Sequence, residues 1–138
     1  MIVTLDTSVL VAALTEEESR SHDAVRMLQN PEVWLISDWA AAEFSAAIRA
    51  KARRGELQES KVGLVDASLD ALIARLGGAF PIEAGDHRRS RELIVEDGGI
   101  RAPDALHIVA AQRLGVSLAT FDLHQARAAE ALGVPVYR

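Results

Sequence analysis

The sequence predicts an α/β protein of three layers, α/β/α, with a central, mostly parallel sheet flanked by helices. Short apolar segments rich in β-branched residues alternate along the chain with segments of helical spacing, and glycine or proline stands at many of the joins. Strands that alternate with helices are typical of a parallel sheet covered by helices on both faces. The chain has 138 residues and no linker, repeat or low-complexity segment, so we expect one domain over residues 1–138.

Each expected element follows from a local pattern. The strands are short apolar runs bounded by polar residues. Most of the helices begin at or next to serine, aspartate or proline, and most end near glycine or at Asn30-Pro31. The expected strands are 2–5, 33–36, 79–82, 116–120 and 134–137. The expected helices are 7–14, about 21–28, Ser37 or Asp38 to about 53, about 60–76, about 86–95, 103–114 and 123–132.

Four acidic residues stand at informative places in this pattern. Asp6 directly follows the first strand, and Asp122 lies two residues after the fourth. Both therefore lie beyond the carboxyl ends of parallel strands, where α/β sheets bind ligands. Asp104 is expected in the first turn of its helix, and Glu43 about one turn into an alanine-rich helix. We expect these carboxylates to converge at one edge of the sheet.

A cluster of carboxylates at one edge has a chemical consequence. Like charges repel and burial raises the cost of each charge, so such a cluster usually persists because it binds a divalent cation. Taken alone, Asp104 and Asp122 are also typical N-terminal residues of helices, and Glu43 could face either solvent or the site. It is the joint pattern that favours a metal-dependent nuclease.

Composition and charge narrow the classes of protein further. The chain has no cysteine, which excludes disulfides, thiolate zinc sites and a cysteine nucleophile. No apolar run is long enough to span a membrane and the first residues carry no basic segment, so we expect a cytoplasmic protein that does not bind membranes. The net charge of −5 does not favour a nucleic-acid partner, but 13 of the 15 basic residues are arginine, and their two densest groups lie at 49–54 and 88–101. Arginine suits phosphate contacts, although a codon bias toward arginine gives the same composition.

Four segments together resemble the PIN-domain nucleases, and among them the VapC-like toxins of type II toxin–antitoxin systems. They are D-T-S-V-L after the first strand, S-D-W-A-A-A-E-F, R-A-P-D-A-L-H-I-V-A-A and L-A-T-F-D. Their order and spacing match the family along essentially the whole chain, and no acid of the pattern is missing. The resemblance implies a single PIN domain with a PIN-like three-layer fold, and an endoribonuclease that uses Mg²⁺, with Mn²⁺ as a substitute.

The resemblance also implies the roles of the four acids. Asp6, Asp104 and Asp122 would hold the metal, and Glu43 would complete the catalytic set. The metal would orient and deprotonate a water for attack on an RNA phosphodiester. Because water is the nucleophile, cleavage would leave a 5′-phosphate and a 3′-hydroxyl.

Supporting residues and partners follow from the same resemblance. Thr7, Ser8 and Thr120 match hydroxyl positions beside the family's acids, where they would hydrogen-bond a ligand or a metal-bound water. Turns and strand ends alone also place such residues there. The implied partners are an RNA substrate, a second copy of the chain in a homodimer, and a VapB-like antitoxin whose C-terminal segment lies across the acidic site.

Several other interpretations can be judged from single positions. Haloacid-dehalogenase-like enzymes need a second aspartate two residues after Asp6, where this chain has Ser8, and receiver domains need a late lysine, whereas the lysines here are Lys51 and Lys61. His107 is expected to pack in its apolar helix or to make one internal hydrogen bond. A non-catalytic PIN-like binding module that receives a basic partner peptide stays open.

Overall fold

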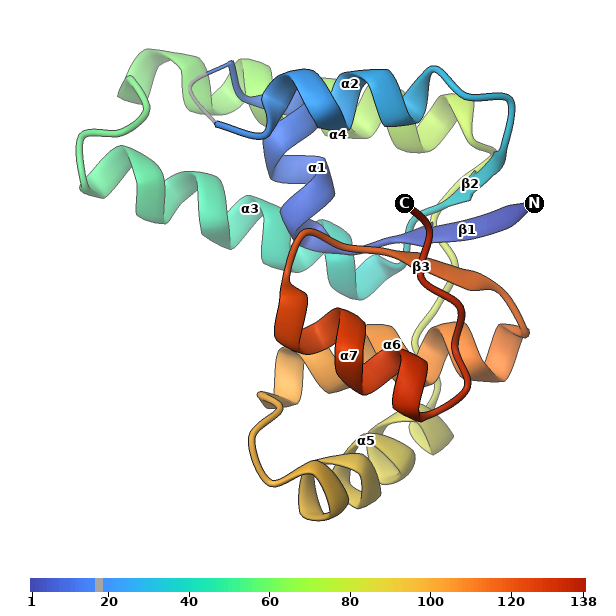
Figure 1. Cartoon of the computed structure of the whole chain (residues 1–138). Helices are drawn as coiled ribbons and strands as arrows, with labels where there is room; N and C mark the ends of the chain where they lie inside the picture. The colour runs from blue at the N-terminus through green and yellow to red at the C-terminus, as the bar shows by residue number, and fades with distance from the viewer. Residues whose placement is uncertain (17–18) are drawn as a thin grey trace.

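The structure is a computed structural model that describes residues 1–16 and 19–138 (Figure 1). Its strands are β1 (Ile2–Leu5), β2 (Val33–Leu35) and β3 (Ser117–Ala119). Its helices are α1 (Thr7–Leu14), α2 (Ser21–Leu28), α3 (Asp38–Arg53), α4 (Val62–Arg75), α5 (Ala84–Asp97), α6 (Ala102–Leu114) and α7 (Leu123–Ala131), with a short 3₁₀ helix, η1 (Glu59–Lys61), before α4. No helix among the described residues is long and apolar enough to cross a membrane.

The strands form one parallel sheet in the order β2-β1-β3. Thr4 of the central strand β1 pairs with Leu35 of β2 on one side and with Leu118 of β3 on the other. The side chains of Val3, Leu5 and Leu118 are fully buried, as expected for strands covered on both faces. The sheet is therefore the middle layer of the molecule.

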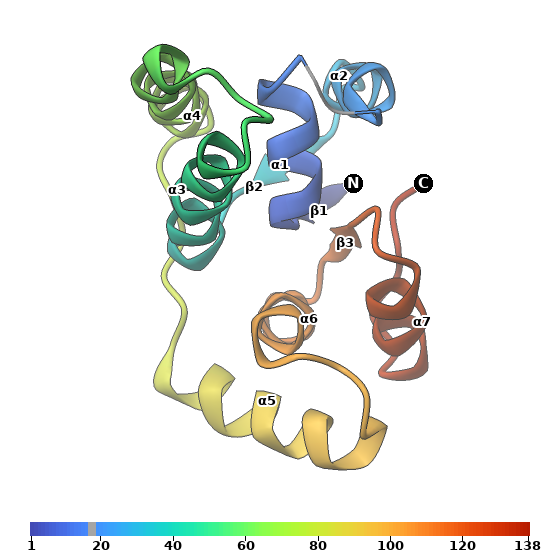
Figure 2. The ribbon, with the colours of Figure 1, turned by 90° about the vertical axis from the view of Figure 1, so that its left-hand side faces the viewer.

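Two layers of helices enclose the sheet. Helices α1 to α4 cover one face and α5 to α7 the other (Figure 2). Leu10, Phe44 and Leu69 belong to the apolar cluster on the first side, and Ile108 and Ala128 to the cluster on the second. Each face of the sheet buries its own apolar cluster. The three-layer α/β/α fold predicted from the sequence is confirmed.

The prediction of strands at 79–82 and 134–137 is wrong, because each of these segments makes only one parallel bridge to the sheet. Pro81 and Pro135 stand next to the bridging residues, and proline has no N–H to donate to a ladder of strands. These segments therefore border the sheet without extending it. The bridges are Ser37 with Phe80, beside β2, and Leu118 with Val136, beside β3.

Helix α5 begins at Ala84, slightly earlier than predicted. Glu83 and Asp86 form a capping box, in which the Glu83 amide donates a hydrogen bond to Asp86 Oδ2 at 2.9 Å. Asp86 is therefore the third residue of the helix rather than its first. Its carboxylate also accepts a hydrogen bond from Arg113 Nε of α6 at 2.9 Å, which fixes the start of α5 against α6.

Candidate functional site

A pocket at the carboxyl edge of the sheet contains all four acids predicted from the sequence. Asp6 caps α1 directly after β1, Glu43 lies in the second turn of α3, Asp104 lies in the first turn of α6, and Asp122 caps α7. Their side chains line one pocket with a volume of about 320 Å³. This edge of the sheet faces the viewer in Figure 2. The parallel sheet thus brings together residues that are far apart in the sequence.

Asp6 is buried, and hydrogen bonds orient both of its carboxylate oxygens. Oδ2 accepts hydrogen bonds from the Ser8 amide at 3.1 Å and from the Ser8 hydroxyl at 2.5 Å. The same oxygen lies 3.2 Å from Thr120 Oγ1. Oδ1 accepts a hydrogen bond from Gln125 Nε2 at 3.3 Å. This carboxylate is therefore held in one position at the floor of the pocket.

Glu43 is paired with His107, which lies on α6 and is 3% exposed. His107 Nε2 is 2.5 Å from Glu43 Oε1 and 3.3 Å from Asp6 Oδ1. Thr7 Oγ1 donates a hydrogen bond to the same Glu43 oxygen at 2.9 Å. Burial disfavours the charged imidazole, but the Glu43 hydrogen bond and the negative charges of Asp6, Glu43 and Asp104 raise the pKa of His107 above its ordinary value. The prediction that His107 only packs or makes one internal hydrogen bond is wrong, because it contacts two carboxylates.

Asp104 is paired with Arg101, the residue that precedes α6. Arg101 Nε donates to Asp104 Oδ2 at 3.0 Å, and Nη2 donates to Oδ1 at 3.4 Å. Burial raises the pKa of Asp104, the negative charges of Asp6 and Asp122 raise it further, and Arg101 opposes both effects. The net shift is upward, so Arg101 only partly relieves the repulsion among these acids.

A comparison with models of protein families identifies the family of the chain. The model of the PIN domain matches residues 3–131. The chain belongs to the PIN domain family. The match includes every side chain of the acidic pocket, and it confirms the resemblance that the four sequence segments indicated. A search of curated protein sequences gave no match.

Several solved structures share the fold of this PIN domain. FitAcB from Neisseria gonorrhoeae is 23% identical, with 100% of this chain and 97% of that chain covered and a TM-score of 0.73. VapC20 from Mycobacterium tuberculosis, a toxin that cleaves the sarcin–ricin loop, is 19% identical over 99% of this chain and 98% of its own, with a TM-score of 0.72. VapBC2 from Rickettsia felis, bound to a DNA fragment from its promoter, is 20% identical over 89% of each chain, with a TM-score of 0.64. At these identities the likeness establishes the fold.

The donor chemistry of the PIN pocket fits a divalent cation. Carboxylate oxygens are the ligands that Mg²⁺ and Mn²⁺ prefer, and the four acids supply them from four separate elements. Within residues 1–16 and 19–138, no three His, Asp or Glu side chains are already grouped as a ligand set. Instead, Arg101 engages oxygens of Asp104, and His107 engages one of Glu43. A cation would therefore bind here by replacing contacts that the protein makes with itself.

The three predicted hydroxyl residues contact the carboxylates themselves. The hydroxyl groups of Ser8 and Thr120 are within hydrogen-bond distance of Asp6, and the hydroxyl group of Thr7 donates a hydrogen bond to Glu43. Their positions support the orientation of these acids by hydrogen bonds. Thr120 Oγ1 also accepts a hydrogen bond from the Asp122 amide at 3.0 Å, so it links the end of β3 to the start of α7.

Gln125 is a residue of the site that the sequence did not indicate. Its side chain is completely buried, and Nε2 donates to Asp6 Oδ1 at 3.3 Å and to the Asp104 carbonyl at 3.2 Å. It therefore connects the floor of the pocket to α6 from the first turn of α7. The signal in the sequence is weak: a polar residue stands on the face of α7 that also carries Ala126 and Ala129. The sequence signal for Arg101 is clearer. Arg101 lies three residues before Asp104, so both residues stand at the start of the same helix.

Proposed function

We propose that this PIN domain, over residues 1–138, is a divalent-metal-dependent endoribonuclease. The observation that supports it most directly is the convergence of Asp6, Glu43, Asp104 and Asp122 in one pocket. Carboxylates in such a pocket are costly, because burial first and the negative charges of Asp6 and Asp122 second raise the pKa of Asp104. A bound Mg²⁺ or Mn²⁺ offsets the repulsion among these charges and also provides the chemistry for hydrolysis of a phosphodiester.

In the proposed mechanism Asp6, Asp104 and Asp122 would hold one or two Mg²⁺ or Mn²⁺ ions. A bound ion of this kind lowers the pKa of a water molecule and stabilises charge on phosphate oxygens. Glu43 accepts the proton of the attacking water, and His107 balances the charge of Glu43 through their 2.5 Å contact. The water oxygen attacks phosphorus in line with the leaving O3′ atom. The P–O3′ bond breaks, the departing O3′ takes up a proton from solvent water, and the products carry a 5′-phosphate and a 3′-hydroxyl.

The biological role that we propose is that of the toxin in a toxin–antitoxin pair. The likeness in fold to FitAcB, VapC20 and VapBC2 over at least 89% of this chain supports this role. An acidic pocket in a chain of net charge −5 suits a basic segment of a VapB-like antitoxin. The proposal includes a homodimer in the cytoplasm, in which the antitoxin covers the acidic pocket and prevents the cleavage of RNA.

One observation favours a second candidate, a PIN-like module that binds a basic peptide without catalysis. Arg101 already pairs with Asp104 from within the chain, as a basic residue of a partner would. A pocket whose acids are balanced by arginine can receive a peptide without any metal. The two candidates differ in whether RNA is cut.

The test compares induced expression of the wild type with the Asp6→Asn/Asp104→Asn variant, followed by sequencing of 5′-phosphate RNA ends. Asp70 is exposed on α4, and Asp70→Asn serves as the matched control for loss of a carboxylate. We expect growth arrest and discrete new ends with the wild type and with Asp70→Asn, and neither with the double variant. Loss of two ligands is expected to lower turnover by more than about a thousandfold.

The purified proteins give the corresponding result in solution. RNA cleavage by the wild type should stop when EDTA removes divalent ions and return when Mg²⁺ or Mn²⁺ is added in excess. If the wild type cuts no RNA and does not arrest growth, the peptide-binding module becomes the better proposal. If the double variant still cuts at the same sites, the acids do not form the catalytic site.

A further inference from the structure

We infer that a groove beside the acidic pocket binds the single-stranded RNA that flanks the cleaved phosphodiester, an inference that rests on the proposed endoribonuclease function. The groove has a volume of about 340 Å³ and lies between α2, the start of α7 and the C-terminal residues. Met27, Phe121, Leu123 and Tyr137 give it an apolar and aromatic surface. Leu123 is 73% exposed and adds to this apolar surface.

Stacking is the first property that suits RNA. The Arg20 guanidinium lies 4.2 Å from the centre of the Phe121 ring, and both residues line the groove. Single-stranded RNA binds to proteins largely by stacking its bases on aromatic rings and on arginine planes. An arginine already stacked on phenylalanine offers a flat surface on which a base can continue the stack.

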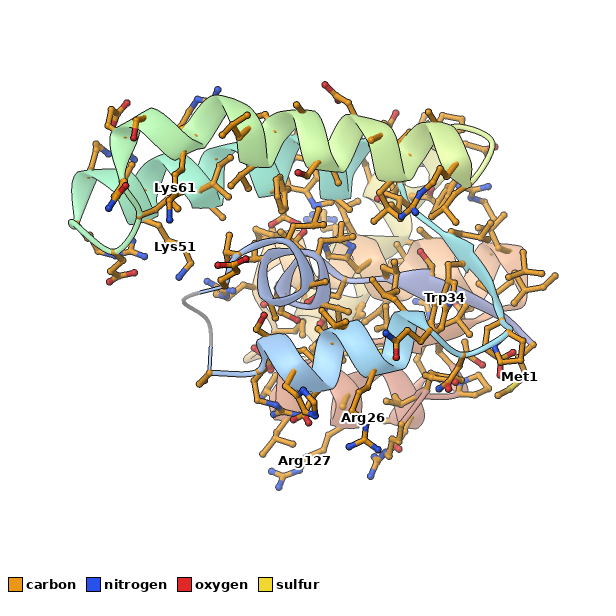
Figure 3. All side chains as sticks on the ribbon, turned by 90° about the horizontal axis from the view of Figure 1, so that it is seen from above. Met1, Arg26, Trp34, Lys51, Lys61 and Arg127 are labelled. Carbon is orange, nitrogen blue, oxygen red and sulfur yellow. The ribbon has the colours of Figure 1, made fainter. Side chains whose placement is uncertain are left out.

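Charge is the second property that suits RNA. Arg20 and Arg138 line the groove and pair with Asp23 and Glu130, so they contribute little net charge. Arg26 and Arg127 are different, because both are exposed and neither forms an ion pair with any residue that the structure describes. Their side chains extend on the same side of the molecule (Figure 3).

These two arginines lie at the borders of the groove. Arg26 precedes the lining residue Met27 on α2, and Arg127 follows the lining residue Ala126 on α7. The two arginines therefore add positive charge beside the groove, although the whole chain has a net charge of −5. Phosphate groups of a nucleic acid complement that charge.

The position of the groove relative to the acids is the third argument. Phe121 lines the groove, and its neighbour Asp122 lines the acidic pocket. Thr120, which contacts Asp6 in the pocket, also borders the groove. A strand of RNA with one phosphodiester at the acids therefore reaches the groove within a few nucleotides. Single-stranded RNA fits this site better than a duplex, because only unpaired bases expose their faces for stacking.

The test measures RNA binding by three variants made in an Asp6→Asn background, where cleavage cannot interfere. The probe is a fluorescein-labelled oligouridylate of about 12 nucleotides, and its anisotropy is measured from about 50 to about 300 mM NaCl. Arg26→Gln/Arg127→Gln should weaken binding about tenfold at the lowest salt and reduce the slope of log K against log salt by about 1.4, because each lost phosphate contact removes about 0.7. Phe121→Leu should weaken binding at least about fivefold and leave the slope unchanged.

The matched control is Arg88→Gln/Arg91→Gln. These two arginines lie on α5, across the sheet from α2, and form no ion pair among the described residues. The control should bind within about twofold of the Asp6→Asn parent. Thermal unfolding of each variant checks that Phe121→Leu, which packs partly against the core, remains folded at the assay temperature.

Three results would overturn the groove: binding by the groove variants equal to that of the parent, an equal loss in the α5 control, or no binding of the probe by the parent. The cleavage experiment with the Asp6→Asn/Asp104→Asn variant tests the proposed endoribonuclease activity separately from RNA binding by the groove. If wild-type cleavage needs the acids but the groove variants bind RNA as well as the parent does, the endoribonuclease proposal stands. Only the inference that the groove binds RNA is then wrong.

Discussion

At the scale of single residues, the pocket is defined by Arg101 and His107 as much as by its acids. Arg101 contacts both oxygens of Asp104, and His107 contacts Glu43 and Asp6. These pairs lower the cost of placing carboxylates together when nothing else balances their charge. They also compete with any divalent cation for the same oxygens.

This competition gives a prediction for Arg101. Replacing it by glutamine removes a positive charge that repels the metal and frees both oxygens of Asp104. Arg101→Gln should therefore bind Mn²⁺ about three- to tenfold more tightly at neutral pH, measured by titration calorimetry. Arg88→Gln on α5 is the matched loss of an arginine and should leave the affinity unchanged.

The pH dependence of this binding has a definite direction. Protons compete with Mn²⁺ for Asp104, and the raised pKa of Asp104 extends that competition to higher pH than for an ordinary aspartate. The affinity should rise with pH and reach its plateau at a higher pH than an ordinary aspartate, with a pKa of about 3.9, would give. Arg101→Gln removes a group that lowers the pKa of Asp104, so its affinity should level off at higher pH than that of the wild type. Weaker Mn²⁺ binding by Arg101→Gln at every pH would instead mean that Arg101 orients Asp104 for the metal.

At the scale of elements, the contact between α5 and α6 depends on Asp86 and Arg113. Asp86 is 2% exposed and accepts hydrogen bonds from Arg113 Nε, from Arg113 Nη2 and from the Glu83 amide. Burial opposes its charge, but these hydrogen bonds and the charge of Arg113 hold the pKa of Asp86 below its ordinary value of 3.8. The structure therefore uses a charged pair, rather than apolar packing alone, to fix α5.

Asp86→Asn should reduce the free energy of unfolding by about 1–3 kcal/mol at neutral pH, because it removes the charge that Arg113 binds. Since the pKa of Asp86 is lower in the folded state, this stabilisation is fully present above its unfolded value of 3.8 and is lost as the pH falls through the folded value. Urea unfolding of both proteins should show the difference at neutral pH and a smaller difference below about pH 3. Asp70→Asn on α4 controls for the loss of an exposed carboxylate. A difference that stays constant down to the lowest pH would contradict the assignment of the effect to this ion pair.

At the scale of the whole molecule, the parts predicted from the sequence are those that local pattern and sheet geometry determine. Asp6 and Asp122 come after strands, and a parallel sheet places the ends of its strands at one edge, so their meeting could be expected. The segments near Pro81 and Pro135 have strand-like composition, but proline limits each to a single bridge. Those errors arise from hydrogen bonding between segments, which composition does not show.

The supporting residues of the pocket were missed for a related reason. His107 meets Glu43 across 64 residues, and Gln125 meets Asp6 across 119 residues. Both stand on largely apolar helix faces, where a polar residue most often makes a local hydrogen bond. Only the packing of α6 and α7 against β1 and α3 brings them to the acids. The roles that we assign to the acids, in contrast, come from the PIN resemblance and stay predictions until tested.

Because the acids come from α3 and from the starts of α1, α6 and α7, a cation bound by them should stabilise the whole fold. Binding to the folded state alone adds about 1.4 kcal/mol to the free energy of unfolding when the free metal is at ten times its Kd. For a chain of this size that corresponds to a rise in Tm of about 3–6 °C. We expect Mn²⁺ to raise the Tm of the wild type and of Asp70→Asn in a concentration-dependent way, and EDTA to reverse it. Asp6→Asn/Asp104→Asn should show no such rise, and an equal rise in that variant would place the stabilising ion outside the acidic pocket.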